Sequence, residues 1–334
     1  MSIDITGLGH AIVDLQFKIN EEFTPIIKNL GIDFGSMTLK DAEGQKELIE
    51  ALSTHNLKSI KACGGSATNS IIAASSFGAK CHYSCKVSND DLGNFYITNL
   101  EENEVTNNIP CKDNSEPTGQ SIIMVTPDTE RTMCTCLGVS ESLSIKDIDI
   151  SGIRNSKFLL IEGYLVTSDS AFKACIEAIK LAKENDTKIA FSLSDHNIVS
   201  AFYDRIQEII MSDIDIIFCN EKEAMAFTSS NSLDNAKKVI SKRAANIFIT
   251  KGENGASVWD GKYFLEIDAV KANAIDSNGA GDMFAGAVLY SLSQELGPIE
   301  SAKFGCYAAS KQVEHFGPRL KKADYLKLKE SYSF

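Results

Sequence analysis

The feature of this sequence that most constrains its fold is a regular alternation of two patterns in its second half. Buried strands are predicted for four short apolar runs, at residues 157–161, 188–193, 215–219 and 246–250. Helices are predicted from apolar residues at helical spacing between and after them, at residues 169–184, 197–211, 221–227 and 232–245. Because such alternation forms parallel strands with helical crossovers, we expect an α/β fold with a mostly parallel central sheet.

The first half has a different pattern. Ile3 to Leu8 reads as a core strand, and helical spacing is found at residues 41–55, 66–77 and 90–101. Half-exposed strand patterns lie between these segments, at residues 13–19, 34–39, 119–126 and 131–137. The last two flank a turn and are typical of a hairpin. We expect a single domain, residues 1–334, with a small β-sheet lid formed by excursions near 13–39 and 110–138. The alternative is an antiparallel extension of the main sheet.

Composition and net charge limit the kinds of partner that this chain is expected to bind. The chain has 334 residues, with 43% hydrophobic and 23% charged residues, which is typical of a globular protein. Its net charge of −12 argues against nonspecific nucleic-acid binding and against attachment to anionic membranes. The N-terminus resembles a first strand more than a signal peptide. Nine scattered cysteines without paired spacing fit reduced thiols, so we expect a cytoplasmic protein, either a monomer or a homodimer.

The heptapeptide Asp276–Asp282, with the sequence Asp-Ser-Asn-Gly-Ala-Gly-Asp, leads into an apolar helical segment. Its glycines and alanine allow backbone N–H groups to gather at a helix start, where the helix dipole favours a phosphate or an oxyanion. Asp282 is then placed to take a proton from an attacking hydroxyl. An anion cradle beside a base is the minimum needed to move a phosphoryl group onto an alcohol. A simple helix cap is the alternative interpretation.

Two motifs in the first half are suited to a polyol ligand. Gly64-Gly65-Ser66-Ala67-Thr68-Asn69 opens a helix, and paired glycines let a ligand approach the backbone. Asn69, one turn into that helix, carries an amide that both donates to and accepts from sugar hydroxyls. Asp14 follows the first strand and can accept two hydroxyl hydrogens. A Gly-x-Gly at residues 7–9 lacks the third glycine of a dinucleotide fingerprint, and no Walker sequence is present.

Two further motifs follow strands of the second half. Asn220-Glu221-Lys222-Glu223 starts a helix, where Glu223 can hold Mg²⁺ through water or simply complement the helix dipole. Lys251, Gly252 and Gly255 form a turn that permits close approach of a flat ligand such as a purine nucleotide. Since ligands bind beyond the carboxyl ends of parallel strands, Asn220, Lys251 and Asp276 are expected at one edge of the sheet.

Taken together, these motifs resemble those of the ribokinase-like (PfkB-type) carbohydrate and nucleoside kinase family. The family signature Asp-Thr-x-Gly-Ala-Gly-Asp matches Asp276–Asp282, with Ser277 in place of threonine. Gly-Gly-x-x-x-Asn, Asn-x-x-Glu and Lys-Gly-x-x-Gly match the segments starting at Gly64, Asn220 and Lys251. Within the family, several stretches are similar to bacterial adenosine kinase-like members, at residues 125–133, 137–138, 162–165, 192–195 and 315–319.

The resemblance implies a three-layer α/β/α sandwich with a β-lid, and it implies roles for individual residues. Asp282 would be the base, and the anion hole would be formed by the backbone N–H groups of Asn278, Gly279, Ala280 and Gly281. The substrate would be bound by Asp14, Gly64, Gly65, Asn69 and, in the closed state, Arg131. Asn220, Lys251, Gly252 and Gly255 would bind ATP, and Glu223 would hold Mg²⁺ through water. Some members of the family also need K⁺ beside the anion hole.

The sequence therefore predicts an ATP- and Mg²⁺-dependent kinase that acts on a primary hydroxyl of a small molecule. Adenosine is the first candidate substrate, and a free sugar such as ribose or fructose is the second. Phe17, Met124, Met133 and Leu137 are suited to cover a purine base, and they are equally suited to form the core of the lid. Two other classes are alternatives: a sensing protein that binds ligand without turnover, and a nicotinamide-dependent oxidoreductase, which the failed fingerprint disfavours.

Overall fold

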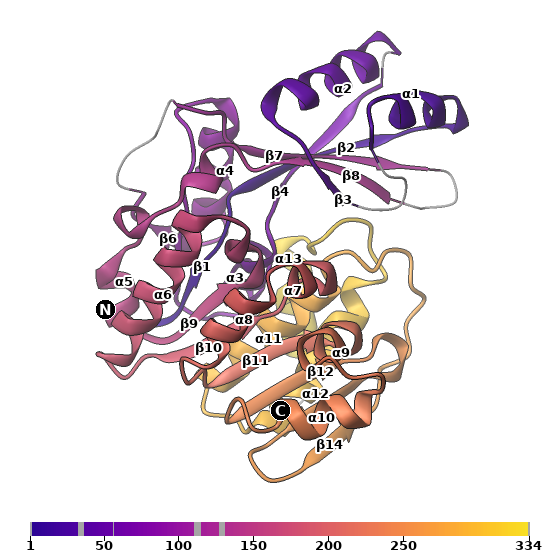
Figure 1. The fold of residues 1–334 in the computed structure, drawn as a ribbon. Coiled ribbons are helices and arrows are strands. Elements are labelled where there is room, and N and C mark those ends of the chain that lie inside the picture. The colour runs from indigo at the N-terminus through magenta and orange to yellow at the C-terminus, as the bar shows by residue number, and fades with distance from the viewer. Residues whose placement is uncertain (1, 33–36, 56, 110–114, 127–130, 333–334) are drawn as a thin grey trace.

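The computed structural model describes residues 2–32, 37–55, 57–109, 115–126 and 131–332 (Figure 1). Its main sheet has nine strands in the order β14-β13-β12-β11-β10-β9-β1-β5-β6. Strands β12 to β6 in this order are parallel, while β13 and β14 are antiparallel additions at one edge. The strands are β1 Ile3–Leu8, β5 Cys81–Ser84, β6 Val105–Asn107, β9 Ser156–Glu162, β10 Lys188–Ser192, β11 Ile216–Asn220, β12 Asn246–Thr250, β13 Ala256–Trp259 and β14 Phe264–Ile267.

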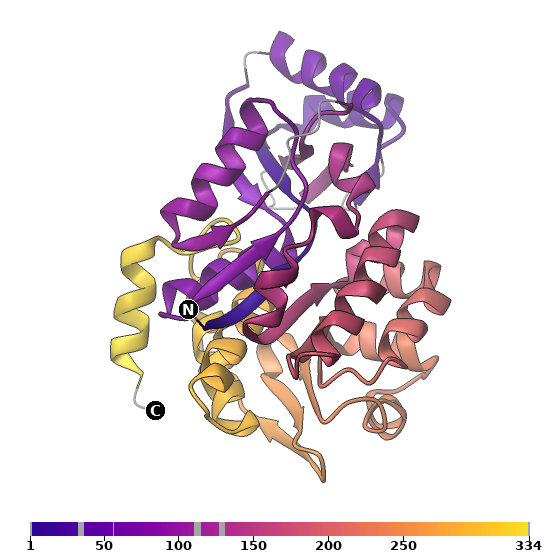
Figure 2. The same ribbon diagram turned by 90° about the vertical axis from the view of Figure 1, so that its left-hand side faces the viewer.

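Helices cover both faces of this sheet, as Figure 2 shows, so the predicted three-layer α/β/α fold is confirmed. One apolar core lies beneath α3 Ser66–Ser76, α4 Asp91–Glu102, α11 Ala280–Ser293, α12 Pro298–Gln312 and α13 Lys322–Ser331. A second core lies beneath α5 Ile150–Arg154, α6 Asp169–Lys183, α7 His196–Ala201, α8 Tyr203–Ile210, α9 Glu221–Thr228 and α10 Leu233–Ile240. Burial of apolar side chains on both faces explains why the parallel strands read as continuous apolar runs.

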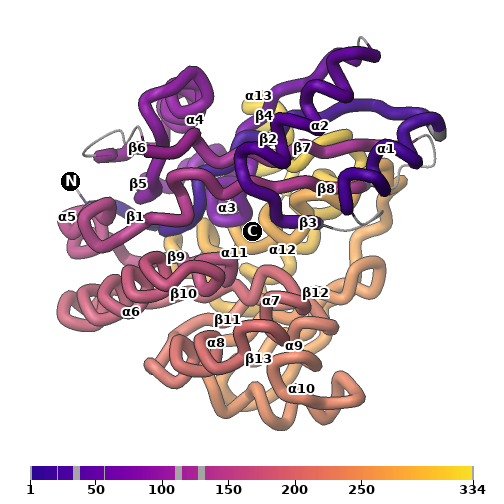
Figure 3. Tube along the Cα trace, turned by 45° about the horizontal axis from the view of Figure 1, so that its top comes forward, coloured from indigo at the N-terminus to yellow at the C-terminus, as the bar shows by residue number. Residues whose placement is uncertain are grey.

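A separate five-stranded sheet forms the lid, and its strands lie side by side in Figure 3. Its order is β3-β8-β7-β2-β4, and β7 and β8 pair as the predicted antiparallel hairpin. The strands are β2 Ile12–Lys18, β3 Met37–Leu39, β4 Ser59–Gly64, β7 Gly119–Val125 and β8 Arg131–Cys136. These strands do not extend the main sheet, so that alternative is wrong. The turn residues 127–130 lie outside the described residues.

The outer face of the lid sheet is covered by α1 Thr24–Asn29 and α2 Ala42–Thr54 (Figure 1). Leu15 and Phe17 of β2 and Met124 of β7 pack beneath these two helices. Because side chains alternate along a strand, Asp14 and Ser121 point to the opposite, inner face. Of the two interpretations of Phe17 and Met124, cover for a purine base and core of the lid, the structure supports the second, since both side chains face away from the strand-end edge.

One predicted helix is interrupted. Residues 197–211 were expected to form a single helix, but the backbone of Phe202, with φ −119° and ψ 36°, separates α7 from α8. The break lets buried residues on both sides, such as Val199 and Ile206, reach the same core. Among the residues described, no helix combines the length and apolar character needed to cross a bilayer. The eight described cysteines are free and buried.

Candidate active site

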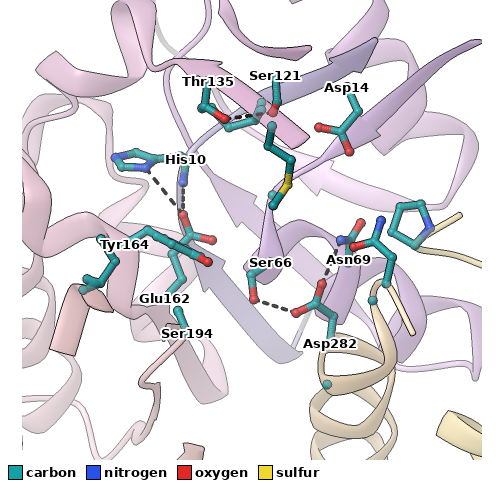
Figure 4. Close-up of a pocket in the computed structure, with 18 of the residues that line it drawn as sticks. His10, Asp14, Ser66, Asn69, Ser121, Thr135, Glu162, Tyr164, Ser194 and Asp282 are labelled. Carbon is teal, nitrogen blue, oxygen red and sulfur yellow. Dashed lines mark hydrogen bonds and ion pairs between the residues drawn. The ribbon is translucent and has the colours of Figure 1, made fainter. Parts of the chain in front are cut away.

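A cavity of about 370 Å³ lies between the inner face of the lid and the main sheet. Asp14 enters it from β2, Asn69 from α3 and Asp282 from the first turn of α11 (Figure 4). Further predicted site residues line the same cavity: Gly65, Asn220, Glu223, Asn278, Gly279 and Gly281. The structure thus brings together residues that lie more than 260 positions apart in the sequence.

Both carboxylate oxygens of Asp282 are held by donors from α3. The hydroxyl of Ser66 donates to Oδ1 at 2.6 Å, and Nδ2 of Asn69 donates to Oδ2 at 2.8 Å. Burial raises the pKa of Asp282, while these two hydrogen bonds oppose the rise. The two helices can pack this closely because Gly286 has no side chain, and a Cβ there would lie 2.3 Å from the carbonyl oxygen of Ser70.

The start of α11 has the geometry of an anion site. Gly279 precedes the helix with φ +74°, which favours glycine, and no side chain caps this end of α11. Asp276 organises the preceding loop, because its carboxylate accepts the N–H groups of Asn278 at 2.9 Å and Gly317 at 2.8 Å. Two of the four donors predicted for the anion hole are therefore directed into the loop in this structure: the N–H of Asn278 at Asp276, and the N–H of Ala280 at the carbonyl oxygen of Ser277, 3.3 Å away.

The inner face of the lid presents a row of polar side chains above Asp282. Asp14, Ser121 and Thr135 are paired across β2, β7 and β8, and the two hydroxyls are 2.8 Å apart (Figure 4). Gly64 is not itself a lining residue, but a Cβ there would lie 2.5 Å from Oδ1 of Asp14. Its role is to leave room for that carboxylate. The side chain of Arg131 lies outside the described residues.

Two buried ionisable residues are among the cavity residues that the sequence did not predict. Glu162 ends β9 and is 1% exposed, and His10 follows β1 and is 2% exposed. Oε1 of Glu162 accepts the backbone N–H of His10 at 2.6 Å, and Oε2 accepts the N–H of Ala67 at 2.9 Å. The strand-end rule that selected Asn220 applies equally to Glu162, and so it was the available signal.

Asn220 and Glu223 form a capping box at the start of α9. Oδ1 of Asn220 accepts the N–H of Glu223 at 2.9 Å, and Oε2 of Glu223 accepts the N–H of Asn220 at 3.0 Å. Within the described ranges, no group of three or more His, Cys, Asp or Glu side chains is arranged to hold a metal ion. One carboxylate with spare lone pairs suits Mg²⁺, which keeps most of its waters and binds substrate phosphates.

A second, larger cavity of about 1180 Å³ adjoins the first at Gly281, which lines both. Lys251, Gly252 and Gly255 line this second cavity together with Ala280. Nζ of Lys251 is paired with Oε2 of Glu266 at 2.6 Å. Three of the four residues predicted to bind ATP are therefore brought together, separated from the first cavity by the start of α11, while the fourth, Asn220, lines the first cavity.

Similar proteins define the class of this one. The solved structure of adenosine kinase from Sinorhizobium meliloti matches with a TM-score of 0.88 and 28% identity, over 98% of this chain and 99% of that chain. A 5-dehydro-2-deoxygluconokinase of Clostridium botulinum is 26% identical over 76% of this chain and 78% of its own length. Adenosine kinase of Dictyostelium discoideum is 28% identical over 71% of this chain and 73% of its own length. The protein is a kinase with an alcohol group as acceptor.

The family assignment is more specific. The model of the pfkB family carbohydrate kinases matches residues 34–324, which is most of the chain. The chain therefore belongs to the pfkB family, as its motifs predicted.

The raised pKa of Glu223 predicts a dependence of stability on pH. Burial, reinforced by the charges of Asp195 and Asp282, raises the pKa of Glu223 from 4.5 to about 7. Between these values the folded protein binds more protons than the unfolded chain, so the free energy of unfolding falls as pH rises. From pH 5 to pH 8, urea unfolding should show wild type losing about 1–3 kcal/mol relative to Glu223→Gln. Parallel pH curves for the two proteins would contradict the prediction. Glu221→Gln, in the same turn, is the matched control.

Proposed function

We propose that the protein transfers the γ-phosphoryl group of ATP, with Mg²⁺, to a primary hydroxyl of an uncharged nucleoside or sugar, with adenosine as the first candidate. The observation that carries the proposal is the position of Asp282. Asp282 lies at the start of α11 and lines the same cavity as Asp14 and Asn69. A base beside an uncapped helix start is what phosphoryl transfer to an alcohol requires.

In the proposed reaction the acceptor lies between Asp282 and the inner face of the lid. Asp14 and Asn69 bind its other hydroxyls and hold the reacting hydroxyl against Asp282, which accepts the proton. The N–H groups at the start of α11 balance charge on the phosphoryl group as it moves from the second cavity to the first. Glu223 would hold Mg²⁺ through water, and the ion would supply positive charge to the phosphates. The lid excludes water, so the phosphoryl group goes to the acceptor.

The charges around the cavity favour an uncharged acceptor. Its lining carries the carboxyl groups of Asp14, Glu162, Glu223 and Asp282, and none of its described lining residues is Lys or Arg. Burial lowers the pKa of His10 to about 4, so this histidine is neutral and adds no compensating charge. A gluconate acceptor, as in the name of the Clostridium relative, carries a carboxylate that these groups would repel.

The apolar part of the lining supports a nucleoside as the first choice. Met133 and Leu137, two of the residues predicted to cover a base, line the cavity together with Ile12, Ile123 and Ile198. A base placed among these side chains would bury apolar surface, whereas a free sugar would leave them uncovered. Ribose or fructose is the second candidate acceptor, and a protein that binds ligand without turnover is the third possibility to be tested.

An acceptor panel tests the proposal. Release of ADP should be measured with Mg²⁺, K⁺ and ATP in the presence of adenosine, ribose, fructose or gluconate. We expect kcat/KM for the best uncharged acceptor to exceed that for gluconate by at least about 100-fold, which corresponds to about 2.7 kcal/mol of discrimination. A preference for gluconate would contradict the charge argument. Binding of adenosine and ATP without ADP release would instead identify a sensing protein.

A further inference from the structure

Glu162 occupies a position that the reaction proposed above leaves unused. It ends β9 at the floor of the acceptor cavity, opposite the lid, and its side chain is almost completely buried (Figure 4). Its two carboxylate oxygens each accept one backbone N–H, from His10 and from Ala67. These two residues belong to different segments of the chain, so the carboxylate joins them.

The two segments connect the lid to the main sheet and its helices, and we call them the lid roots. His10 lies between β1 of the main sheet and β2 of the lid, and Ala67 follows β4, which returns from the lid into α3. The first of these segments packs tightly on Glu162, because a Cβ at Gly9 would lie 2.7 Å from Cδ of Glu162. Glu162 also supplies the helix α3 with an acceptor that its own sequence lacks, since Gly65 offers no capping side chain.

The connection from Glu162 to the reacting centre is short. Ala67 is preceded by Ser66 and followed, two positions on, by Asn69, and these two side chains hold the carboxylate of Asp282. A shift of the first turn of α3 would move both donors away from Asp282. We infer that Glu162 is a positioning residue, whose carboxylate fixes the lid roots and the start of α3 and thereby orients Asp282 for proton transfer. This inference rests on the proposed function.

The ionised form of Glu162 is the one that can hold both segments. A carboxylate accepts two N–H groups, whereas protonation converts one oxygen into a donor and removes one of the bonds. Burial raises the pKa of Glu162 to about 7, the two N–H bonds oppose the rise, and the charge of Asp282 adds to it. The His10 ring, 3.8 Å away, is neutral. The other groups facing Glu162 are also neutral because their pKa values are raised: Tyr83, Cys85, Tyr96, Tyr164 and Cys175.

The pH dependence of kcat at saturating MgATP tests the inference, because bound Mg²⁺ favours the ionised form of Glu223 and removes its contribution. Wild-type kcat should fall below an inflection near pH 7. Glu162→Gln accepts only one N–H, so its kcat should be about 10- to 100-fold lower with little change in KM, and the only inflection left should be that of the base Asp282, whose pKa burial also raises. Glu162→Asp keeps the charge, so this variant should regain part of the lost kcat.

Asp90→Asn is the matched control. Asp90 also joins two segments, accepting the N–H groups of Gly93 at 2.7 Å and Thr118 at 2.8 Å, but it does not line the cavity. This variant should lose stability and keep the inflection near pH 7. A merely structural role for Glu162 would give the same result for Glu162→Gln, and that outcome would overturn the inference.

Hydrogen exchange gives a readout that needs no acceptor and so separates this inference from the proposed function. In Glu162→Gln, amides at residues 9–12 and 66–70 should exchange faster than in wild type, while those of α12 are unchanged. If the variant does not fold, hydrogen exchange of the wild-type protein at several pH values tests the inference instead. Protection of the same amides, corrected for intrinsic exchange rates, should fall as pH drops below about 7. Protection that does not change with the variant or with pH would overturn the inference.

Discussion

Asp282→Asn is expected to lower kcat by about 10²–10⁴-fold with little change in KM for ATP or acceptor, because the amide cannot accept a proton. The substitution preserves size, and the amide oxygen can still accept the hydroxyl of Ser66. Steady-state ADP release, together with thermal unfolding to show that the variant is folded, measures the effect. The variant's activity should stay low at every pH, because no group at position 282 titrates.

Ser66→Ala is the companion variant for this prediction. It removes one of the two hydrogen bonds to Asp282 and leaves the carboxylate in place, so its kcat should fall by only about 10-fold. Equal losses in the two variants would show that packing around position 282, and not its basicity, limits the rate. Undiminished activity of Asp282→Asn would show that Asp282 is not the base.

Gly279→Ala is expected to have the second large effect, a loss of about 10²–10³-fold in kcat. Gly279 has φ +74°, and a Cβ there would lie 2.1 Å from the carbonyl oxygen of Pro318. The start of α11 must therefore move, which takes its N–H groups out of line with the phosphoryl group. We also expect a loss of roughly 1–2 kcal/mol in the free energy of unfolding, measured in urea.

Gly297→Ala provides the control for Gly279→Ala. Gly297 precedes α12 with an ordinary φ of −70°, and a Cβ there meets no atom within 4 Å. This variant should keep wild-type kcat and stability. If Gly279→Ala retains full activity despite its lower stability, the start of α11 does not bind the transferred phosphoryl group.

Much of the site followed from one rule applied to the sequence. Parallel strands end at one edge, so polar residues just after apolar runs had to lie close together, as Asn220 and Lys251 do around the start of α11. Glu162 obeys the same rule, but it lies within a stretch read only as a sign of similarity to adenosine kinases. No sequence pattern shows that its acceptors are the backbone groups of His10 and Ala67, since hydrogen bonds to backbone leave no side-chain signature.

The lid shows what alternating strand patterns can predict and what they cannot. Its hairpin followed from alternation and a turn, but the pattern left two interpretations open for Phe17, cover for a purine base and core of the lid. Asp14 and Phe17 are three positions apart in one strand, so alternation alone puts them on opposite faces. Phe17 belongs to the core of the lid because α1 and α2 cover the outer face, whereas the inner face of β2 carries the polar side chain of Asp14.

The central claim, that Asp282 deprotonates the acceptor hydroxyl at the start of α11, is tested most directly by a crystal structure of Asp282→Asn with adenosine and MgATP bound. We predict that the primary hydroxyl lies within about 3 Å of the side chain at position 282 and faces the γ-phosphorus across the start of α11. A complex in which that hydroxyl points away from position 282, with another base beside it, would contradict the account.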